Sequence, residues 1–305
     1  MIRGLIGRAL DWRFRAVITR LDEVGERCRH LEELLEGRVE PMLRAVFDEE
    51  AENRRRLFAL RSSSGYERPF LEEDPLVSVA IATRGQGEEL IERALPSLLS
   101  QSHSNLEVIV VGDAAPAELG ERLAAVDDDR VRFTNLTQRT AAHRDPAQHW
   151  LVGSTIPRNE AARLARGQWL VHFDDDDRMR PDAIAQLLCC AREQRAEVAY
   201  GGFEIHGPDG SLERALRFPP TFGSFGWQGA LVHRGLRFFE RELSAVSIPL
   251  PGDLYMLERM LRVGVRFAML ERIVWDYYPS SINSPESTRQ TDSQISSATA
   301  SGMSL

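Results

Sequence analysis

Four consecutive aspartates, Asp174 to Asp177, are the residues whose type and spacing point most directly to chemistry. They directly follow Trp169 to Phe173, an apolar run with the composition of a buried strand. Four carboxylates in one turn repel one another, so their placement is costly unless a cation neutralises them. Carboxylate oxygens suit Mg²⁺ or Mn²⁺, which often share phosphate oxygens with a substrate. The cluster therefore predicts a divalent-metal site for a phosphorylated substrate, and a solvated acidic turn is the alternative.

Two further apolar runs end in polar residues that can join this site. They are Val77 to Ala82, followed by Thr83, Arg84 and Gly85, and Leu106 to Val111, followed by Gly112 and Asp113. If both runs are parallel neighbours of Trp169 to Phe173, their carboxyl ends meet at the edge where open sheets bind ligands. We expect Asp113 to hydrogen-bond a base or ribose. Arg84 and Arg158 are expected to contact phosphates, which the planar guanidinium suits.

The elements that must position these residues alternate between strands and helices from about Pro75 to Pro279. Helices are expected at residues 88–101, 116–126 and 158–166, a short strand around Val131 to Phe133, and a further helix opening at Pro181 and Asp182. This alternation predicts an α/β fold, with a mostly parallel sheet covered by helices on both faces.

The ordered series of motifs resembles the family 2 glycosyltransferases, which have the GT-A fold, Rossmann-like in its sheet and helices. The matching segments are Val77 to Arg84, Pro96 to Ser102, Leu106 to Asp113, Arg158 to Ala162, Ala165 to Trp169, and Asp174 to Asp176 as the DXD motif. The resemblance covers about two thirds of the chain. It implies transfer of a sugar from a UDP-, GDP- or dTDP-sugar to an acceptor hydroxyl, with inversion and with Mn²⁺ or Mg²⁺ as cofactor. The acceptor is a glycan, a lipid-linked sugar or a small molecule.

The same resemblance implies roles for individual residues. Nucleotide-sugar contacts fall on Ala82, Thr83, Arg84, Asp113, Arg158, Asp174 and Asp175, metal ligands on Asp176 and Asp174, and the catalytic base on Asp253. As a base, Asp253 would accept the acceptor's proton, which is typically worth roughly a hundred- to ten-thousand-fold in rate. Because Pro251 and Gly252 precede a helical pattern, Asp253 can also cap that helix.

Several positions on the acceptor side and in the family pattern are less specific. Trp227, His233 and Tyr255 are secondary acceptor candidates, and Trp227 is expected either to stack on a sugar or to pack in the core. His172 alternates inside a strand, which favours a packed core histidine. The acceptor loops are expected at residues 218–229 and 240–251. Departures from the family pattern are Gly85, Gly112 and Gly252, where relatives often carry Asn, Asp and an acidic residue.

Residues 1–64 form a separate zone with helical periodicity. Apolar residues recur at spacings of three and four at Phe14, Val17, Leu21, Val24, Cys28, Leu31, Leu35 and Met42, with Arg38 interrupting. This seam predicts a helix that packs on its own domain, a homo-oligomeric coiled coil, or a basic amphipathic helix on anionic lipid. Pro41 is expected to kink or end the first helix. A second helical stretch, Leu43 to Arg61, precedes a linker at Ser62 to Gly65.

The composition of the chain narrows the functional classes. A net charge of −8 over 305 residues argues against a dedicated nucleic-acid binder. Three cysteines without metal-ligand spacing fit a reducing compartment and no disulfide framework. Neither a signal peptide nor a spanning segment is evident, so we expect a cytoplasmic protein, free or resting on the inner face of the membrane. The Ser/Thr-rich residues 280–305 are expected to be a disordered tail.

Two other functions stay open from the sequence. A sugar nucleotidyltransferase also uses a sheet edge, carboxylates and a metal, but no glycine-rich, lysine-bearing phosphate loop lies near the first strand. The chain can also be a catalytically weakened scaffold whose heptad seam is the working part. The intact Asp174 to Asp177 run and Asp253 argue against that second alternative.

Overall fold

The computed structural model describes residues 19–279, except 22, 86, 141–151, 222 and 248–250. The chain divides into two compact units, Met1–Arg56 and Leu57–Leu305. Phe14, Val17 and the predicted tail at 280–305 lie outside the described residues. Within the described ranges, no helix combines the length and the apolar composition that crossing a bilayer requires.

The first unit is helical throughout its described residues. Helical turns cover residues 23–34, a π-helical turn, η1, covers Leu35–Val39, and α2 covers Glu40–Arg61. Pro41 was expected to kink or end the first helix; the helix does not end there, because α2 continues through this residue. A proline lacks the N–H that an α-helix needs and its ring crowds the carbonyl four residues earlier. The helix departs from regular α-helical form directly before Pro41, in the π-helical turn at Leu35–Val39.

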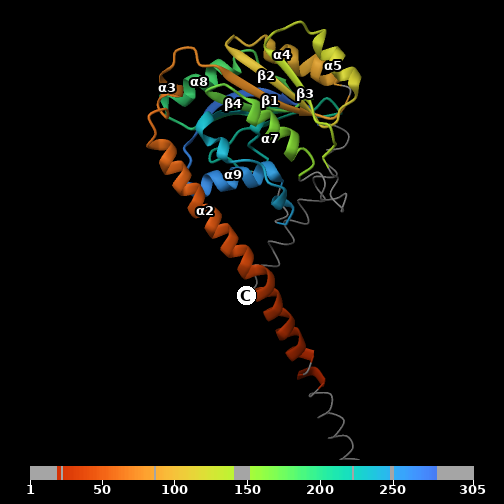
Figure 1. Cartoon of the computed structure of the whole chain (residues 1–305), viewed down its shortest axis with the longest axis vertical. Helices are drawn as coiled ribbons and strands as arrows, with labels where there is room; N and C mark the ends of the chain where they lie inside the picture. The colour runs from red at the N-terminus through yellow and green to blue at the C-terminus, as the bar shows by residue number, and fades with distance from the viewer. Residues whose placement is uncertain are drawn as a thin grey trace, which may run out of the picture. The chain divides into compact units, whose positions relative to one another are not determined.

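A sheet of nine strands, counted over the described residues, is the centre of the second unit (Figure 1). Its order is β3 (Val131–Asn135), β2 (Leu106–Gly112), β1 (Val77–Thr83), β4 (Trp169–Phe173), β8 (Ala230–His233), β6 (Val198–His206), β9 (Phe267–Tyr277) and β5 (Arg178–Met179), with β7 (Leu212–Ala215) beside β6. The first four strands of this order are parallel, and β8 runs antiparallel to both β4 and β6. The predicted α/β class is confirmed.

Helices cover both faces of this sheet (Figure 1). One face carries η2 (Leu90–Ala94), α4 (Leu95–Leu99), α5 (Ala117–Ala124) and α8 (Ala183–Glu193), and the other carries α7 (Thr155–Leu164) and α9 (Gly252–Val263). Short helices are α3 (Arg68–Leu71), η3 (Trp227–Gly229), η4 (Arg234–Phe238) and η5 (Leu243–Ser247). Every residue of β1, β2 and β4 is buried, which explains why these strands have continuous apolar runs rather than alternation.

The last turn of α2 belongs to the second unit. Leu57 and Leu60 pack into its hydrophobic core, so the division between units falls inside α2, ahead of Ser62. Arg61 donates two hydrogen bonds of 2.7 Å to the buried carboxylate of Glu197, which also accepts from the Tyr66 hydroxyl at 2.9 Å. Burial alone would raise the pKa of Glu197, but these donors lower it. The paired charges fix this turn against the sheet.

Candidate active site

Strand register brings the predicted strand ends to one edge. β1 lies between β2 and β4, with Thr83 opposite Gly112 and Ile81 opposite Phe173. The backbone N–H of Asp113 donates to the Thr83 carbonyl at 2.8 Å. Because the three strands are parallel, the residues after each one converge at the carboxyl edge of the sheet, where ligands bind in this class of fold.

The aspartates after β4 converge further. Asp174, Asp176 and Asp177 each offer a carboxylate oxygen within 4.8 Å of the others, and we call these three residues the aspartate cluster. Asp177 is fully buried, and its Oδ1 accepts the Tyr278 backbone N–H at 3.1 Å. Its Oδ2 has no hydrogen-bond partner among the described residues. Asp177 belongs to the acidic run predicted as a metal site, but no individual role was predicted for it.

The pKa values of the aspartates after β4 show an excess of negative charge over positive charge. Burial, followed by the charges of Asp174 and Asp175, raises the pKa of Asp176 to about 7. Burial and the neighbouring aspartates likewise hold the pKa of Asp177 well above its ordinary value. The pKa of Asp175 is also raised, mainly by burial. A divalent cation would favour the charged form of each carboxylate.

Two side chains hold Asp174 from opposite sides. Arg158 of α7 donates from Nη2 to Asp174 Oδ1, and its Nε donates to Ser154 Oγ at 2.9 Å. Gln228 in η3 donates to Asp174 Oδ2 at 2.6 Å. Arg158 was predicted from the sequence. Gln228 was missed, because nothing in its local pattern distinguishes it from the rest of its glycine-rich stretch.

A second arginine, Arg241, lies buried near Arg158 and was not foreseen. Its side chain is 6% exposed, and its Nη1 donates to His172 Nδ1 at 3.2 Å. Burial and the charge of Arg158 lower the pKa of Arg241 to about 10. Burial and the same two arginines lower the pKa of His172 well below its ordinary value, so the ring is neutral and accepts this bond. His172 is therefore buried, as predicted, and supports the site from β4.

Asp253 occupies the second position of α9, and its side chain is exposed. Its Oδ1 accepts the Leu254 backbone N–H at 2.8 Å. Its charge favours the charged forms of both Arg158 and Arg241, although burial and Arg158 still lower the pKa of Arg241 overall, and its helix α9 packs on the same face of the sheet as α7. The residue predicted as a catalytic base thus lies near the aspartate cluster, with an accessible carboxylate.

Trp227 and Tyr255 are both buried near Asp253. The Trp227 indole donates from Nε1 to the Asp253 carbonyl oxygen at 3.0 Å and meets the His172 ring edge-on, with centroids 6.0 Å apart. Trp227 was expected either to stack on a sugar or to pack in the core. It packs in the core, and its hydrogen bond anchors the start of α9. Tyr255 is enclosed on α9, with the Arg259 guanidinium 5.3 Å from its ring centre.

His233 is the one predicted site residue that the structure places at the opposite edge of the sheet. β8 runs antiparallel to β4, so His233 pairs with Trp169 at the amino end of β4. Its ring packs among Tyr66, Phe70 and Trp169, and its Nε2 lies 3.1 Å from the Tyr66 carbonyl oxygen. It does not reach the aspartate cluster.

The remaining predicted residues lie at the ends of β1 and β2. Asp113 is buried, and its Oδ1 accepts both the N–H and the hydroxyl of Thr140 at 2.7 Å. Ala82 and Thr83 are buried, and Arg84 is exposed. A side chain at Gly112 would run into Asn135, whose amide is bonded to both backbone groups of Ala115. This contact explains glycine where relatives often carry aspartate.

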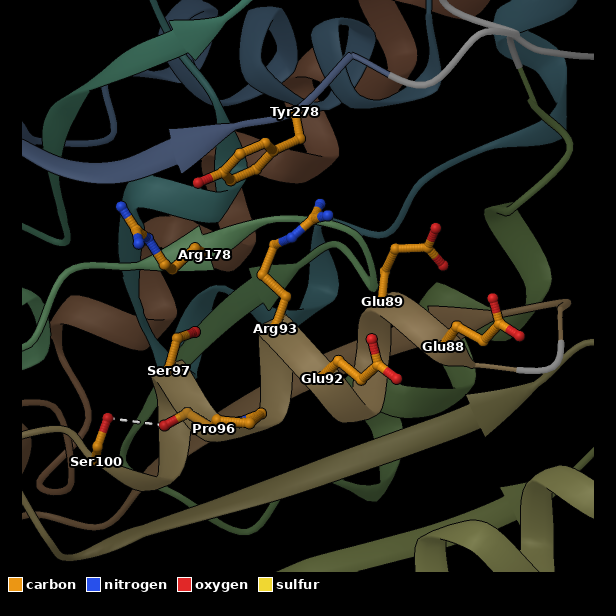
Figure 2. A pocket seen from close by; sticks show the side chains of 9 residues that line it. All are labelled: Glu88, Glu89, Glu92, Arg93, Pro96, Ser97, Ser100, Arg178 and Tyr278. Carbon is orange, nitrogen blue, oxygen red and sulfur yellow. Dashed lines mark hydrogen bonds between the residues drawn. The ribbon is translucent and has the colours of Figure 1, made fainter.

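Two adjoining cavities open beside the aspartates. The larger, about 580 Å³, is shown in Figure 2 and is lined by Glu88, Glu89, Glu92, Arg93, Pro96, Ser97, Ser100, Arg178 and Tyr278. The smaller, about 180 Å³, reaches Asp175 and shares Glu88 and Glu89 with the first. Arg93 links the larger cavity to the cluster: it lines the cavity, donates to the Asp176 carbonyl oxygen at 2.5 Å and lies over the Tyr278 ring.

A second group of metal-type ligands, Glu204, His206 and Asp276, has a different character. Three arginines neutralise it: Arg180 lies 2.6 Å and Arg178 2.7 Å from Asp276, and Arg214 lies 2.8 Å from Glu204. The hydrogen bond from Arg214 lowers the pKa of Glu204, and those from Arg180 and Arg178 lower that of Asp276 against the effect of burial. We call Glu204, His206 and Asp276 the arginine-matched cluster. The arginines balance its carboxylates, so it needs no metal.

Comparison with known proteins shows which family the second unit is similar to. The family model described as glycosyl transferase family 2 matches residues 147–246. The chain is 29% identical to the succinoglycan biosynthesis protein ExoO of Rhizobium meliloti over 149 residues. This alignment covers 49% of this chain and 38% of ExoO. It is 24% identical to the poly(ribitol-phosphate) beta-N-acetylglucosaminyltransferase TarP of Staphylococcus aureus, over 46% of this chain and 40% of TarP.

The fold is also similar to that of a solved glycosyltransferase structure. S. aureus TarS residues 1–349, determined in complex with UDP-GlcNAc, superimposes with a TM-score of 0.50 at 14% identity, over 67% of this chain and 59% of that one. The predicted resemblance to family 2 glycosyltransferases and the GT-A arrangement are confirmed by these matches. The chain spans about two fifths of the length of the two curated relatives.

Proposed function

We propose that this chain, whose second unit carries a family 2 glycosyltransferase domain, transfers a sugar from a nucleoside-diphosphate sugar to an acceptor hydroxyl with inversion. One observation carries the proposal. The aspartate cluster lies at the carboxyl edge of four parallel strands, and its carboxylates have fewer cationic partners than charges. Such a site is suited to a divalent metal and the diphosphate that the metal would bind.

The donor set of the cluster fits Mg²⁺ or Mn²⁺, since both prefer oxygen ligands. Asp176, Asp174 and Asp177 would hold the metal, and the unpartnered Oδ2 of Asp177 is a buried oxygen that a cation would satisfy. When bound, the metal would neutralise charge on the departing diphosphate. Arg158 pairs with one oxygen of Asp174 and orients the carboxylate, and Gln228 fixes its second oxygen.

The nucleotide part of the donor would lie across the ends of β1 and β2. Asp113, Thr83 and Asp175 line this edge, with Ala82 beneath it and Arg84 exposed beside it. Asp113 already orders Thr140 through two hydrogen bonds, so it would shape the base site as well as contact the nucleoside. Arg84 supplies a cationic side chain for a phosphate.

Asp253 is the proposed base. Its carboxylate is exposed, while its backbone is held by Trp227 and its Oδ1 by the Leu254 N–H, so the side chain is presented in a fixed direction. It would accept the proton of the acceptor hydroxyl as that oxygen attacks the anomeric carbon. A single displacement of this kind inverts the anomeric centre. The β-specific name of the relative TarP is consistent with inversion of an α-linked donor.

Substrates and location follow from the relatives as part of the same proposal. ExoO is named for succinoglycan biosynthesis and TarP for poly(ribitol-phosphate), so a hydroxyl of a growing polymer is the acceptor class we propose. A UDP-sugar is the first donor to test, because TarS was determined with UDP-GlcNAc. We further propose a cytoplasmic site of action at the inner face of the membrane, with residues 1–64 serving assembly and 75–279 serving catalysis.

The experiment that tests this function follows a panel of sugar nucleotides with the full chain in Mn²⁺, in Mg²⁺ and in EDTA. We expect metal-dependent release of nucleoside diphosphate, and a β-linked product from an α-linked donor once an acceptor sugar is supplied. Formation of sugar nucleotide from sugar phosphate and nucleoside triphosphate would instead identify a nucleotidyltransferase. Retention at the anomeric carbon would contradict the single displacement.

A further inference from the structure

The helix of the first unit carries an apolar seam whose side chains are exposed. Leu21, Val24, Leu31 and Leu35 are 64%, 55%, 58% and 56% exposed, and Cys28 between them is also exposed. Their spacing of three then four puts Leu21, Cys28 and Leu35 at the a positions of a heptad and Val24 and Leu31 at the d positions. The heptad phase holds up to Leu35, where the π-helical turn begins.

The charges beside the seam indicate what kind of partner covers it. Residues 20–38 contain four arginines, Arg20, Arg27, Arg29 and Arg38, against six acidic residues, Asp22, Glu23, Glu26, Glu32, Glu33 and Glu36. Helices that lie on anionic lipid are rich in basic residues on their polar face. A helix with an acidic balance is repelled by such a surface. The seam therefore favours a protein partner.

The residues flanking the seam distinguish the two orientations of a helix pair. Arg27 occupies a g position and Glu32 the e position five residues later. In a parallel, in-register pair these two positions face each other across the seam, so Arg27 of each copy meets Glu32 of the other. In an antiparallel pair, g faces g, and arginine would meet arginine. The charges are complementary only in the parallel arrangement.

We infer that residues 19–35 of this chain pair with the same residues of a second copy as a parallel, in-register coiled coil. This inference concerns assembly and stands apart from the proposed catalytic function. It has one geometric consequence that can be measured. Cys28 at an a position faces Cys28 of the second copy, in the range of Cα separations, about 4.4–6.8 Å, that a disulfide spans.

Crosslinking of the full chain tests orientation and register together. Diamide, which accepts the two electrons and two protons of the paired thiols, is added to the native protein, and products are separated without reductant. We expect a covalent dimer in the wild type and in the matched control Cys189→Ser, which removes an exposed thiol of α8. Cys28→Ser should form none. A crosslink that persists in Cys28→Ser, or a wild type that is monomeric by light scattering at micromolar concentration, would overturn the inference.

A charge exchange supplies an independent check that needs no oxidant. Arg27→Glu should weaken self-association roughly tenfold by placing two glutamates opposite each other on both sides of the seam. Combining it with Glu32→Arg should restore the wild-type mass. In an antiparallel pair Arg27 does not face Glu32 across the seam, so adding Glu32→Arg would not restore association, and that result would refute the assignment. Thermal unfolding, measured in each variant, shows whether the fold of the second unit is unchanged.

Discussion

The aspartate cluster and the arginine-matched cluster contain similar ligands but differ in how their charge is balanced. The carboxylates of Asp176 and Asp177 have raised pKa values, because burial and neighbouring aspartates oppose ionisation. Asp276, which is as buried as Asp177, has a lowered pKa because Arg178 and Arg180 donate to it. The two clusters are neighbours in the chain, because Asp177 directly precedes Arg178, the first residue of β5 and a partner of Asp276.

The difference teaches that acidic residues alone do not define a metal site. A buried carboxylate must be paired, protonated or bound to a cation. In the arginine-matched cluster, both carboxylates are paired with arginines of the protein. In the aspartate cluster, Arg158 is paired with Asp174, and the remaining negative charge is left for a ligand to balance.

The largest effect is expected on turnover. Asp253→Asn keeps the shape of the side chain but cannot accept a proton, so kcat should fall at least about a hundredfold while UDP binding changes little. Glu204→Gln, a matched loss of one carboxylate from the arginine-matched cluster, should leave kcat close to wild type. Steady-state kinetics and calorimetry measure the two quantities. Reduced thermal stability with unchanged kcat would show that Asp253 only caps α9.

Stability in the absence of metal should respond with opposite signs in the two clusters. Asp276→Asn leaves the partly exposed Arg178 and Arg180 without their counter-charge, so we expect a loss of about 1–3 kcal/mol in the free energy of unfolding. Asp176→Asn removes a repelling charge and should raise the melting temperature by about 2–4 °C for each kcal/mol relieved. Both are read from thermal unfolding in EDTA. A lower melting temperature for Asp176→Asn would contradict the excess of negative charge.

Acid should separate the clusters in a further way. The folded-state pKa of Asp276 is lowered, so its contribution to stability is present above the unfolded value of about 4 and is lost as pH falls through the lower folded value. Urea midpoints between about pH 5 and 2.5 should therefore fall more steeply in the wild type than in Asp276→Asn. Equal slopes would mean that the arginines do not stabilise the ionised form of Asp276.

The smallest effect is expected at Trp227. Trp227→Phe removes the hydrogen bond to the Asp253 carbonyl oxygen but keeps an aromatic ring against His172. A neutral hydrogen bond of this type is worth about 0.5–1.5 kcal/mol, so kcat should fall roughly two- to tenfold. UDP affinity is the control and should stay within twofold. An unchanged kcat would show that this bond does not position the base.

Local pattern was enough to predict the parts of the site that follow strands. Asp113 and Asp174 come directly after fully buried runs, and parallel pairing brings such ends together without further information. The same logic could not find Gln228 or Arg241, because their partners, Asp174 and His172, are 54 and 69 residues away in the sequence. His233 was misplaced for a related reason, since its position depends on the direction of β8.

The sequence also could not predict which acidic residues are paired with arginines. Asp276 is an isolated acidic residue in an aromatic strand, and its pairing with Arg178 across 98 residues appears only when β5 and β9 come together. The π-helical turn before Pro41 is another case, because proline rules predict a break and the chain adopts a wider turn instead. The division into residues 1–64, 75–279 and 280–305 stays a prediction.

The most direct test of the central claim is calorimetric titration of UDP into the full chain, with and without Mn²⁺, for the wild type, Asp176→Asn and Glu204→Gln. If the aspartate cluster holds the metal, Mn²⁺ should strengthen UDP binding in the wild type and in Glu204→Gln by at least about tenfold, and should have no effect in Asp176→Asn. Mn²⁺-dependent binding that survives in Asp176→Asn, or is lost in Glu204→Gln, would contradict the account.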